Sequence, residues 1–411
     1  MFKNINCKNL PSLRRNIVYQ FLYELLIVFI PLFTIPYVSR VLGAENIGLF
    51  SYTYAVANYF VLFANLGIKN YGSRTIAMVR NNKEELNRNF SEILSIHIIF
   101  SIIVIFVYLV LLFFFVEDNL VIFLIQSIYV FAAVFDINWF FFGIEKFKLT
   151  VGRNTLVKIL SVFLVLVFVK TQTDLWIYAL ILALSVFVGQ SVVWFALKQY
   201  VSWRRPSWAN MKQHIRPLFV LFLPILALSL YKYMDKIMLG SISSNVQVGF
   251  YENAEKIINV PMSLIMAFGV VLMPRIANMV TSKDKGEVFK LIDMSMEAVM
   301  LLAIAISFGL AGISFVLAPI FFGYEFEECG ILIMGLAVTV PFMAFANVIR
   351  TQYLIPYKED KIFVVSLFLG TAVNLIVNII LIPYMAARGA VIGTIFAEII
   401  VCIYQSYFVR K

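Results

Sequence analysis

The sequence predicts an all-α integral membrane protein with about twelve transmembrane helices in two six-helix halves. Three features support this fold class: a high apolar content, long continuous apolar stretches, and landmarks that repeat between the halves. The 411 residues are 62% hydrophobic and 14% charged, whereas soluble domains carry roughly 25% charged residues. Because the apolar stretches are continuous rather than alternating, helices are expected instead of barrel strands.

A helix that crosses a membrane needs about 20 apolar residues, and this criterion separates twelve spans. The predicted spans are residues 16–38, 46–67, 90–115, 120–142, 151–170, 175–197, 217–240, 249–273, 291–314, 329–349, 362–382 and 389–409. Residues 1–15 are polar and the next apolar stretch has full span length, so no cleavable signal peptide is expected. The segments between spans are short, which argues against a soluble catalytic domain and therefore against an enzyme.

The net charge of +10 reflects membrane topology and not nucleic-acid binding. Most of the 33 Lys and Arg residues fall on the membrane side of the N-terminus, whereas Arg40, Lys170 and Arg388 fall on the opposite side. The positive-inside rule therefore places both termini in the cytoplasm. Contact with anionic membrane lipids is expected as a secondary role of the basic segments.

The two halves of the sequence repeat one pattern, "SRVLGAENIGLFSY" (39–52) and "DKIMLGSISSNVQVGFY" (235–251). Each half has a glycine, an arginine 26 residues later and an acid 18 residues further on: Gly48, Arg74 and Glu92, then Gly249, Arg275 and Asp293. Six spans per half make the halves parallel repeats. We predict lobes at 1–200 and 217–411, joined by a cytoplasmic linker at 201–216, which is a transporter architecture.

Charged residues inside the predicted spans are the candidate functional residues. Each costs at least about 2.5–3.5 kcal/mol at the bilayer centre, so each is expected to face a cavity or a partner. They are Glu24, Asp136, Lys158, Lys232, Asp235, Lys236, Glu252, Glu255, Lys256 and Glu398. The three cysteines and two histidines show no metal-ligand spacing, so neither a metal site nor a cofactor is expected.

The charges around residues 232–256 allow two interpretations. Lys232 and Lys236 share one helix face, and Lys236 is about level with Glu252 across the predicted helical hairpin. Paired charges of this kind would hold the hairpin together. Alternatively, Lys232 or Lys256 lines a water-filled cavity and binds an anionic part of a substrate.

Isolated polar residues elsewhere also have two interpretations. Asp136 and Glu398 are either cation or proton sites, or acids whose polar groups are satisfied by helix packing. Asn374 and Asn378 share a face of one span and are expected to link helices rather than to bind substrate.

Five stretches of the sequence resemble one transporter family. They are "NIVYQFLYELLIVFIPLFTIPYVSRVLGAENIGLFSY" (16–52), "YMDKIMLGSISSNVQVGFYENAEKI" (233–257), "MPRIANM" (273–279), "QYLIPYKEDKIF" (352–363) and "PYMAARGAVIGTIFAEI" (383–399). In these stretches the chain resembles the Wzx-type polysaccharide and O-antigen flippases of the multidrug/oligosaccharidyl-lipid/polysaccharide exporter (MOP) superfamily. The resemblance covers nearly the whole chain.

This resemblance implies a V-shaped, MATE-like arrangement of two lobes in the bacterial cytoplasmic (inner) membrane. It implies alternating-access transport of an undecaprenyl-pyrophosphate-linked oligosaccharide to the outer leaflet, driven by an ion or proton gradient. A polysaccharide polymerase and chain-length machinery are the expected partners. We predict that Lys232, Lys256, Arg40 and Lys158 bind the anionic substrate. The candidates for ion coupling are Glu24, Asp136, Asp235 and Glu398.

Two other classes of function are compatible with the sequence. A MATE-type cation-coupled multidrug antiporter would share the architecture but would need an acidic cavity, for which Glu24, Asp136 and Glu398 are available. A non-transporting membrane scaffold or a lipid-modifying enzyme is the third possibility, and the absence of large loops and catalytic clusters argues against the enzyme.

Overall fold

The computed structural model describes residues 10–281 and 285–409, and all regular structure in these ranges is helical. The first seven α-helices are α1 (Leu10–Asn65), α2 (Ile68–Val79), α3 (Lys83–Phe115), α4 (Leu120–Val134), α5 (Asn138–Gly143), α6 (Phe147–Phe168) and α7 (Leu175–Leu197). The others are α8 (Trp208–Ile242), α9 (Asn245–Thr281), α10 (Lys285–Phe322), α11 (Cys329–Ala337), α12 (Thr339–Val348), α13 (Asp360–Met385) and α14 (Ala387–Val409). Short helical turns are η2 (Gln172–Asp174), η3 (Tyr324–Phe326) and η4 (Ile349–Leu354).

The structure has eleven helical segments in the described ranges that are long and apolar enough to cross a membrane, where the sequence predicted twelve. The difference arises at α1, which continues through the predicted spans 16–38 and 46–67. Its 56 residues would measure roughly 84 Å as a straight helix, far more than a bilayer core of about 30 Å. Gly43 (φ 78°, ψ 171°) interrupts the helical geometry between the two predicted spans, so α1 supplies two passes.

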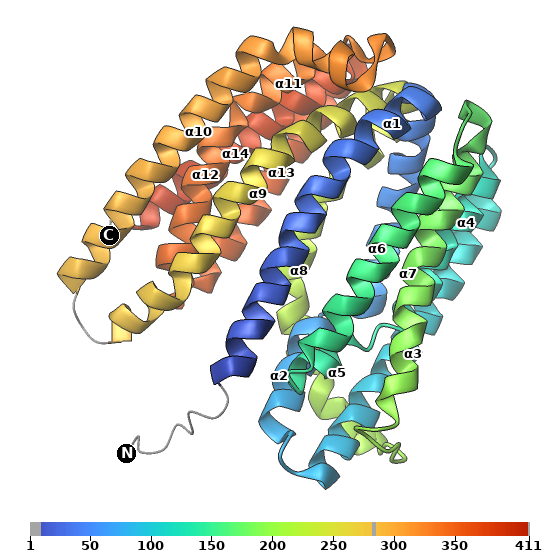
Figure 1. The fold of residues 1–411 in the computed structure, drawn as a ribbon, viewed down its shortest axis with the longest axis vertical. Helices are drawn as coiled ribbons and strands as arrows, with labels where there is room; N and C mark the ends of the chain where they lie inside the picture. The colour runs from blue at the N-terminus through green and yellow to red at the C-terminus, as the bar shows by residue number, and fades with distance from the viewer. Residues whose placement is uncertain (1–9, 282–284, 410–411) are drawn as a thin grey trace. The chain divides into compact units, whose positions relative to one another are not determined.

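The first of two compact units contains residues 56–225 and the start of α1 up to Thr34. Within it α3 and α7 both pack along α4, and α6 packs along α7 (Figure 1). Asn82 begins α3, because its side chain accepts hydrogen bonds from the backbone N–H groups of Glu84 and Glu85. An aromatic core joins α3 to α5, with the Phe90 ring 5.5 Å from Trp139 and 4.9 Å from Phe140.

The second unit contains residues 35–55 of α1 and the chain from Leu226 onward. Here α13 packs along α14, and α10 packs against α11 and α12 (Figure 1). Large apolar side chains remain exposed on the outside of α10, including Leu301 (72% exposed) and Phe308 (76%). Exposed apolar side chains of this size are expected on a helix that faces lipid.

The two glycines that marked the sequence repeat lie in contact inside the second unit. A Cβ atom on Gly48 would lie 1.6 Å from the carbonyl oxygen of Asn245, and one on Gly249 would lie 2.1 Å from that of Ala44. Gly48 therefore lies against the backbone next to Gly249, and Gly249 lies against the backbone next to Gly48. A larger residue at either position would require the backbone to move. The repeat thus creates a reciprocal crossing of the two inter-helix turns.

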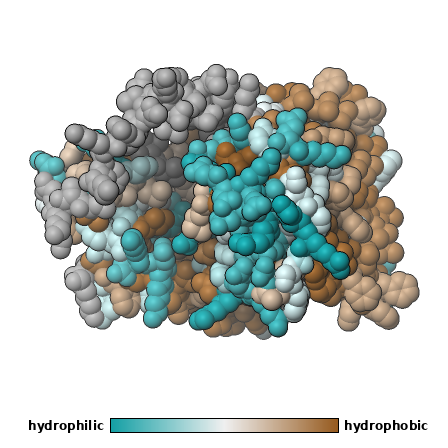
Figure 2. Space-filling view, turned by 90° about the horizontal axis from the view of Figure 1, so that it is seen from below, coloured by the Kyte–Doolittle hydropathy of each residue, from teal (hydrophilic) through white to brown (hydrophobic). Residues whose placement is uncertain are grey.

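Hydrophilic side chains gather on the face seen from the end at which α2 lies, with hydrophobic side chains beside them (Figure 2). This distribution is typical of a helical bundle end that leaves the membrane for water. The predicted linker 201–216 includes an extended stretch and the start of α8 at Trp208. The predicted division into lobes at 1–200 and 217–411 stays a prediction.

Candidate functional site

A buried polar cluster in the second unit surrounds Asp235, one of the predicted ion-coupling residues. Asp235 comes from α8, Tyr251 from α9, Asn374 and Asn378 from α13, and Thr394 from α14. The Asp235 carboxylate is 5% exposed and the two asparagines are 2% and 0% exposed. Two consecutive helix pairs that are distant in sequence, α8–α9 and α13–α14, therefore converge on one carboxylate.

Three side chains donate hydrogen bonds to this carboxylate. The Tyr251 hydroxyl lies 2.6 Å from Oδ2, the Thr394 hydroxyl 3.1 Å from Oδ2, and Asn378 Nδ2 2.6 Å from Oδ1. Asn378 Nδ2 also donates to Asn374 Oδ1 at 3.1 Å. Gly393 leaves room for Asn378, because a Cβ there would lie 2.2 Å from Asn378 Oδ1. The asparagines thus link helices, as the sequence predicted, and they do so through Asp235.

The cluster carries one formal negative charge and has no counter-ion among the described residues. The lysine next to it in sequence, Lys236, forms its ion pairs with Glu252 and Glu255 instead. A buried charge is costly unless it is paired and hydrogen-bonded, so three donors reduce the cost without cancelling the charge. The side-chain atoms of the cluster that could ligate a cation are mostly oxygens, which is the ligand type that hard cations prefer. The cluster is therefore suited to one proton or one monovalent cation.

A second buried carboxylate lies one helical turn from this cluster. The Tyr231 hydroxyl of α8 donates to Glu398 Oε1 of α14 at 2.6 Å, and Glu398 is 5% exposed. Tyr231 precedes Asp235 by four residues, and Glu398 follows Thr394 by four, so both pairs are about 6 Å apart along their helices. The α8–α14 interface therefore holds two acids, and occupation of one by a cation would affect the other electrostatically.

Two lysines of the α8–α9 hairpin, Lys236 and Lys256, form ion pairs with described glutamates, and Lys232 does not. Lys236 Nζ lies 2.6 Å from Glu252 Oε2 and 2.8 Å from Glu255 Oε2, and Lys256 Nζ lies 3.1 Å from Glu252 Oε1. These four side chains form a closed, neutral group that joins α8 to α9. Lys232 instead is exposed, with its Nζ 5.4 Å from the centre of the Tyr233 ring. The ion pairs of Lys236 and Lys256 agree with the interpretation that charges hold the hairpin together, and a substrate-binding role for Lys232 or Lys256 stays a prediction.

The remaining predicted residues occupy separate places. In the second unit, the Arg40 guanidinium donates to the carbonyl of Ile320 at 2.5 Å. In the first unit, Lys158 is exposed on α6, and no described carboxylate forms an ion pair with it. Asp136 lies in the break between α4 and α5 and accepts hydrogen bonds from the backbone N–H and side chain of Asn138 at 3.0 and 2.7 Å. The side chain of Glu24 lies outside the described residues.

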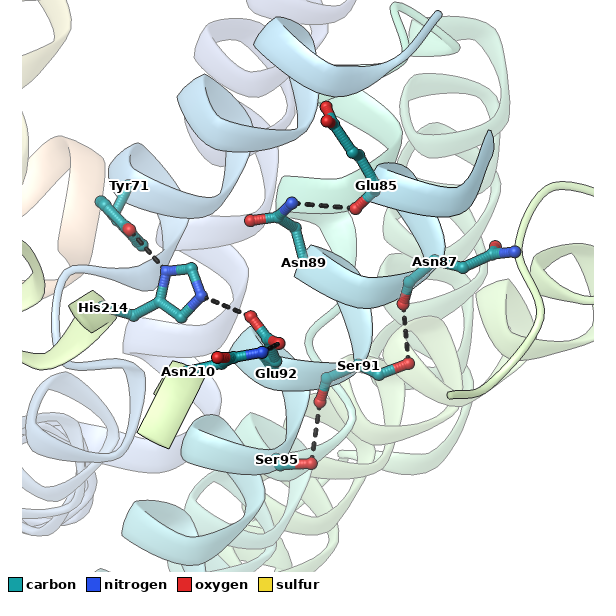
Figure 3. A network of polar contacts seen from close by, with 9 residues as sticks. All are labelled: Tyr71, Glu85, Asn87, Asn89, Ser91, Glu92, Ser95, Asn210 and His214. Carbon is teal, nitrogen blue, oxygen red and sulfur yellow. Dashed lines mark hydrogen bonds and ion pairs between the residues drawn. The ribbon is translucent and has the colours of Figure 1, made fainter. Parts of the chain in front are cut away.

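The sequence analysis did not identify a polar network in the first unit (Figure 3). His214 of α8 bonds through Nε2 to Glu92 Oε2 at 2.9 Å and through Nδ1 to the Tyr71 hydroxyl at 2.6 Å. Asn210 donates to the other Glu92 oxygen at 3.1 Å. His214 and Glu92 are 3% and 1% exposed. Glu92 was noted only as a repeat landmark, and its partners lie more than 110 residues away, so no local pattern pointed to the network.

Two further hydrogen bonds attach the segment before α8 to α3. The backbone N–H of Ser202 donates to Asn87 Oδ1 at 2.9 Å, and that of Arg204 donates to Ser91 Oγ at 2.9 Å. Together with the Glu92–His214 pair, these bonds fix the start of α8 on α3. The network thus has a structural role within the first unit.

The fold defines a helical membrane protein with many spans, and solved structures of transporters share it. The structure is similar to "Lipid II flippase MurJ, inward closed conformation", with a TM-score of 0.74, 15% identity, and coverage of 96% of this chain and 87% of that one. It is also similar to an inward-facing multidrug resistance MATE family transporter of the MOP superfamily, with a TM-score of 0.70, 15% identity, and coverage of 95% and 97%.

The family itself follows from sequence. A family model described as "Polysaccharide biosynthesis protein" matches residues 13–280, so the chain belongs to this family. The proteins named "Putative O-antigen transporter" from Shigella dysenteriae and Escherichia coli K12 are 24% and 26% identical to it. The alignments cover 96% and 98% of this chain and 99% and 98% of those proteins. The resemblance to polysaccharide flippases is thereby confirmed.

Proposed function

We propose that the protein is a flippase for lipid-linked oligosaccharides. Its cargo would be a repeat unit on undecaprenyl pyrophosphate, moved from the cytoplasmic to the outer leaflet by alternating access. Two relatives of matching length bear the name of O-antigen transporters, which supports this cargo class. Flipping is transport without covalent chemistry, so no catalytic residues are required.

The observation that carries the proposal is the uncompensated carboxylate of Asp235. A buried acid with three hydrogen-bond donors and no described counter-ion is suited to bind and release one cation during each cycle. Asp235 would bind the proton or monovalent cation, and Tyr251, Asn378 and Thr394 would orient its oxygens. Glu398, one turn away, would sense the occupation of Asp235 through the shared α8–α14 interface.

Among the four predicted substrate residues, Lys232 and Lys158 are the most available to an anionic cargo. Both are exposed, and neither forms an ion pair with a described acid. Lys256 and Arg40 are partly committed to Glu252 and to the Ile320 carbonyl. We therefore propose Lys232 in the second unit and Lys158 in the first, each taken separately, as candidates for the first contact with the pyrophosphate.

The proposed setting is the bacterial inner membrane with both termini in the cytoplasm. The excess of Lys and Arg in the segments on the terminal side supports this orientation. A polysaccharide polymerase and chain-length machinery would then receive the cargo on the opposite side. Orientation is testable by labelling single introduced cysteines with a membrane-impermeant thiol reagent in whole cells.

The test is complementation of a bacterial strain that lacks its own polysaccharide flippase. Surface polysaccharide would be measured after expression of the wild type, Asp235→Asn and Lys232→Ala at matched membrane levels. Glu327→Gln, which changes an exposed acid, is the control. We expect restoration by the wild type and the control, and loss with Asp235→Asn. Equal restoration by Asp235→Asn would refute the assigned coupling role.

A multidrug antiporter is the second candidate, because the fold is similar to that of a MATE family transporter. Its cargo would be cationic, so acids rather than lysines would control its activity. Expression in a drug-sensitive strain distinguishes the two functions. Resistance that depends on Asp136 or Glu398 and not on Lys232 would favour the antiporter over the flippase.

A further inference from the structure

Arg350 is a partly buried arginine that forms no hydrogen bond or ion pair through its guanidinium with any described residue. Its Nε atom is buried and has no acceptor. Arginine carries five N–H donors, and arginines with buried donors are nearly always paired. The guanidinium of Arg350 therefore has N–H donors that an anionic ligand could accept from.

The backbone around Arg350 departs from ordinary α-helical geometry. Residues Ile349–Leu354 form a π-helix, with bonds from Ile355 N to Arg350 O at 3.0 Å and from Glu359 N to Leu354 O at 2.8 Å. The Thr351 hydroxyl bonds to the Asn347 carbonyl at 2.8 Å, which competes with regular helix bonding. Such π-helical turns occur frequently at functional sites, because they redirect side chains.

The surroundings of Arg350 hold its guanidinium in place and leave it available to bind an anion. Its Cζ atom lies 5.1 Å from the centre of the Phe363 ring on α13, a cation–π contact that fixes the plane of the group. The ring also excludes water from one side, which strengthens electrostatic attraction on the other. Lys358, before α13, and Lys361, in its first turn, are both exposed.

Acidic residues nearby do not cancel this charge. Glu359 and Asp360, at the start of α13, balance the charges of Lys358 and Lys361, but both acids are exposed and neither bonds to Arg350. The neighbouring Gln352 is fully buried and donates to Ser295 Oγ at 2.6 Å, so its amide group fixes η4 to α10 instead. The Phe363 ring thus contacts the guanidinium of Arg350, the Gln352 bond fixes the backbone of η4, and the charge of Arg350 stays available.

We infer that Arg350 is the central residue of an anion site that takes a phosphate group carried on a lipid. The planar guanidinium presents two parallel N–H donors, which match two oxygens of a phosphate. This site is separate from the lysines of α8 and α9 and rests on the proposed function for its ligand, the diphosphate of a polyprenyl carrier. An anionic phospholipid headgroup offers the same chemistry and is the other source.

The test is binding of defined lipids to the purified full chain, measured by native mass spectrometry. The probes are undecaprenyl diphosphate, uncharged undecaprenol and phosphatidylglycerol. The variants are Arg350→Met, Arg350→Lys, and Lys361→Met as a control that removes an exposed charge two residues from Phe363. Loss of a charged hydrogen-bonding group should weaken diphosphate binding roughly 10- to 100-fold in Arg350→Met, partly rescued in Arg350→Lys and unchanged in Lys361→Met.

The three probes separate the sources of the phosphate. A diphosphate preference that Arg350→Met abolishes supports the carrier, and an equal effect on phosphatidylglycerol supports a phospholipid headgroup. If Arg350→Met binds both charged lipids as the wild type does, the inference is wrong. Thermal unfolding of each variant distinguishes lost binding from lost folding, because Arg350→Lys should remain folded whatever the fate of Arg350→Met.

Failure of this inference is distinguishable from failure of the proposed function. If the wild type restores surface polysaccharide and Arg350→Met restores it equally, without a change in lipid binding, the flippase stands and the Arg350 site falls. If the wild type fails to restore polysaccharide but binds the lipid, and Arg350→Met does not bind it, the anion site stands and the proposed function falls.

Discussion

Removal of Lys236 should destabilise the protein much more than removal of Lys232, although both are lysines of α8. Lys236 is 7% exposed and lies within 2.8 Å of both Glu252 and Glu255. Removal of one partner from a buried ion pair costs about 3–5 kcal/mol. Lys256 still neutralises Glu252 at 3.1 Å, so we place Lys236→Met at the lower end, about 3 kcal/mol.

The assay is reversible denaturant unfolding of purified variants in a fixed detergent. Lys232→Met is the matched control, since an exposed residue without an ion pair should change the free energy of unfolding by about 0.5 kcal/mol or less. Adding Glu255→Gln to Lys236→Met removes the uncompensated charge and should recover part of the loss. Equal stability of the two single variants, or a further loss on adding Glu255→Gln, would refute the ion-pair argument.

Two further predictions concern packing. Gly249→Ala should cost roughly 1–3 kcal/mol or more through backbone displacement, measured by thermal unfolding, whereas Gly309→Ala, where nothing lies within 4 Å, should be neutral or stabilising; similar melting temperatures would contradict the glycine crossing. His214→Ala removes one hydrogen bond from Glu92 and one from Tyr71, and each buried group left unsatisfied should lower the stability by about 1–3 kcal/mol. It should speed limited proteolysis at 201–207, and Lys212→Ala should not; equal cleavage rates would show that the network does not anchor the segment.

Much of the fold could be predicted because membrane helices depend on local composition. A window of about 20 apolar residues locates each span without knowledge of its neighbours. The first two predicted spans form one continuous element, α1, because only Gly43 interrupts the helical geometry between them. The repeated glycines were found by spacing alone, but their contact with backbone of the opposite turn depends on tertiary packing that a sequence does not specify.

The candidate site was predictable only in part for the same reason. Asp235 and Glu398 stood out as acids in apolar stretches, where a charge is expensive. Their partners Tyr251, Thr394 and Tyr231 did not, because tyrosine and threonine are common in membrane helices and helix rotation decides which of them face inward. Side-chain partners on different helices are set by packing between residues far apart in sequence.

The possible role of Arg350 could not be predicted from the sequence either. The sequence placed it in a basic segment at the end of a span, where its charge served only as a topology signal. The missing acceptor for its Nε atom and the π-helix that contains it emerge only from the three-dimensional arrangement.

The central claim is that Asp235 couples a cation gradient to transport, and one measurement tests it most directly. Purified protein would be reconstituted into liposomes with a lipid-linked oligosaccharide, and transfer between leaflets would be followed with and without an imposed Na⁺ or proton gradient. The account predicts that one of the gradients accelerates transfer by the wild type and Glu327→Gln, but not by Asp235→Asn. The same gradient dependence in Asp235→Asn and the wild type would contradict it.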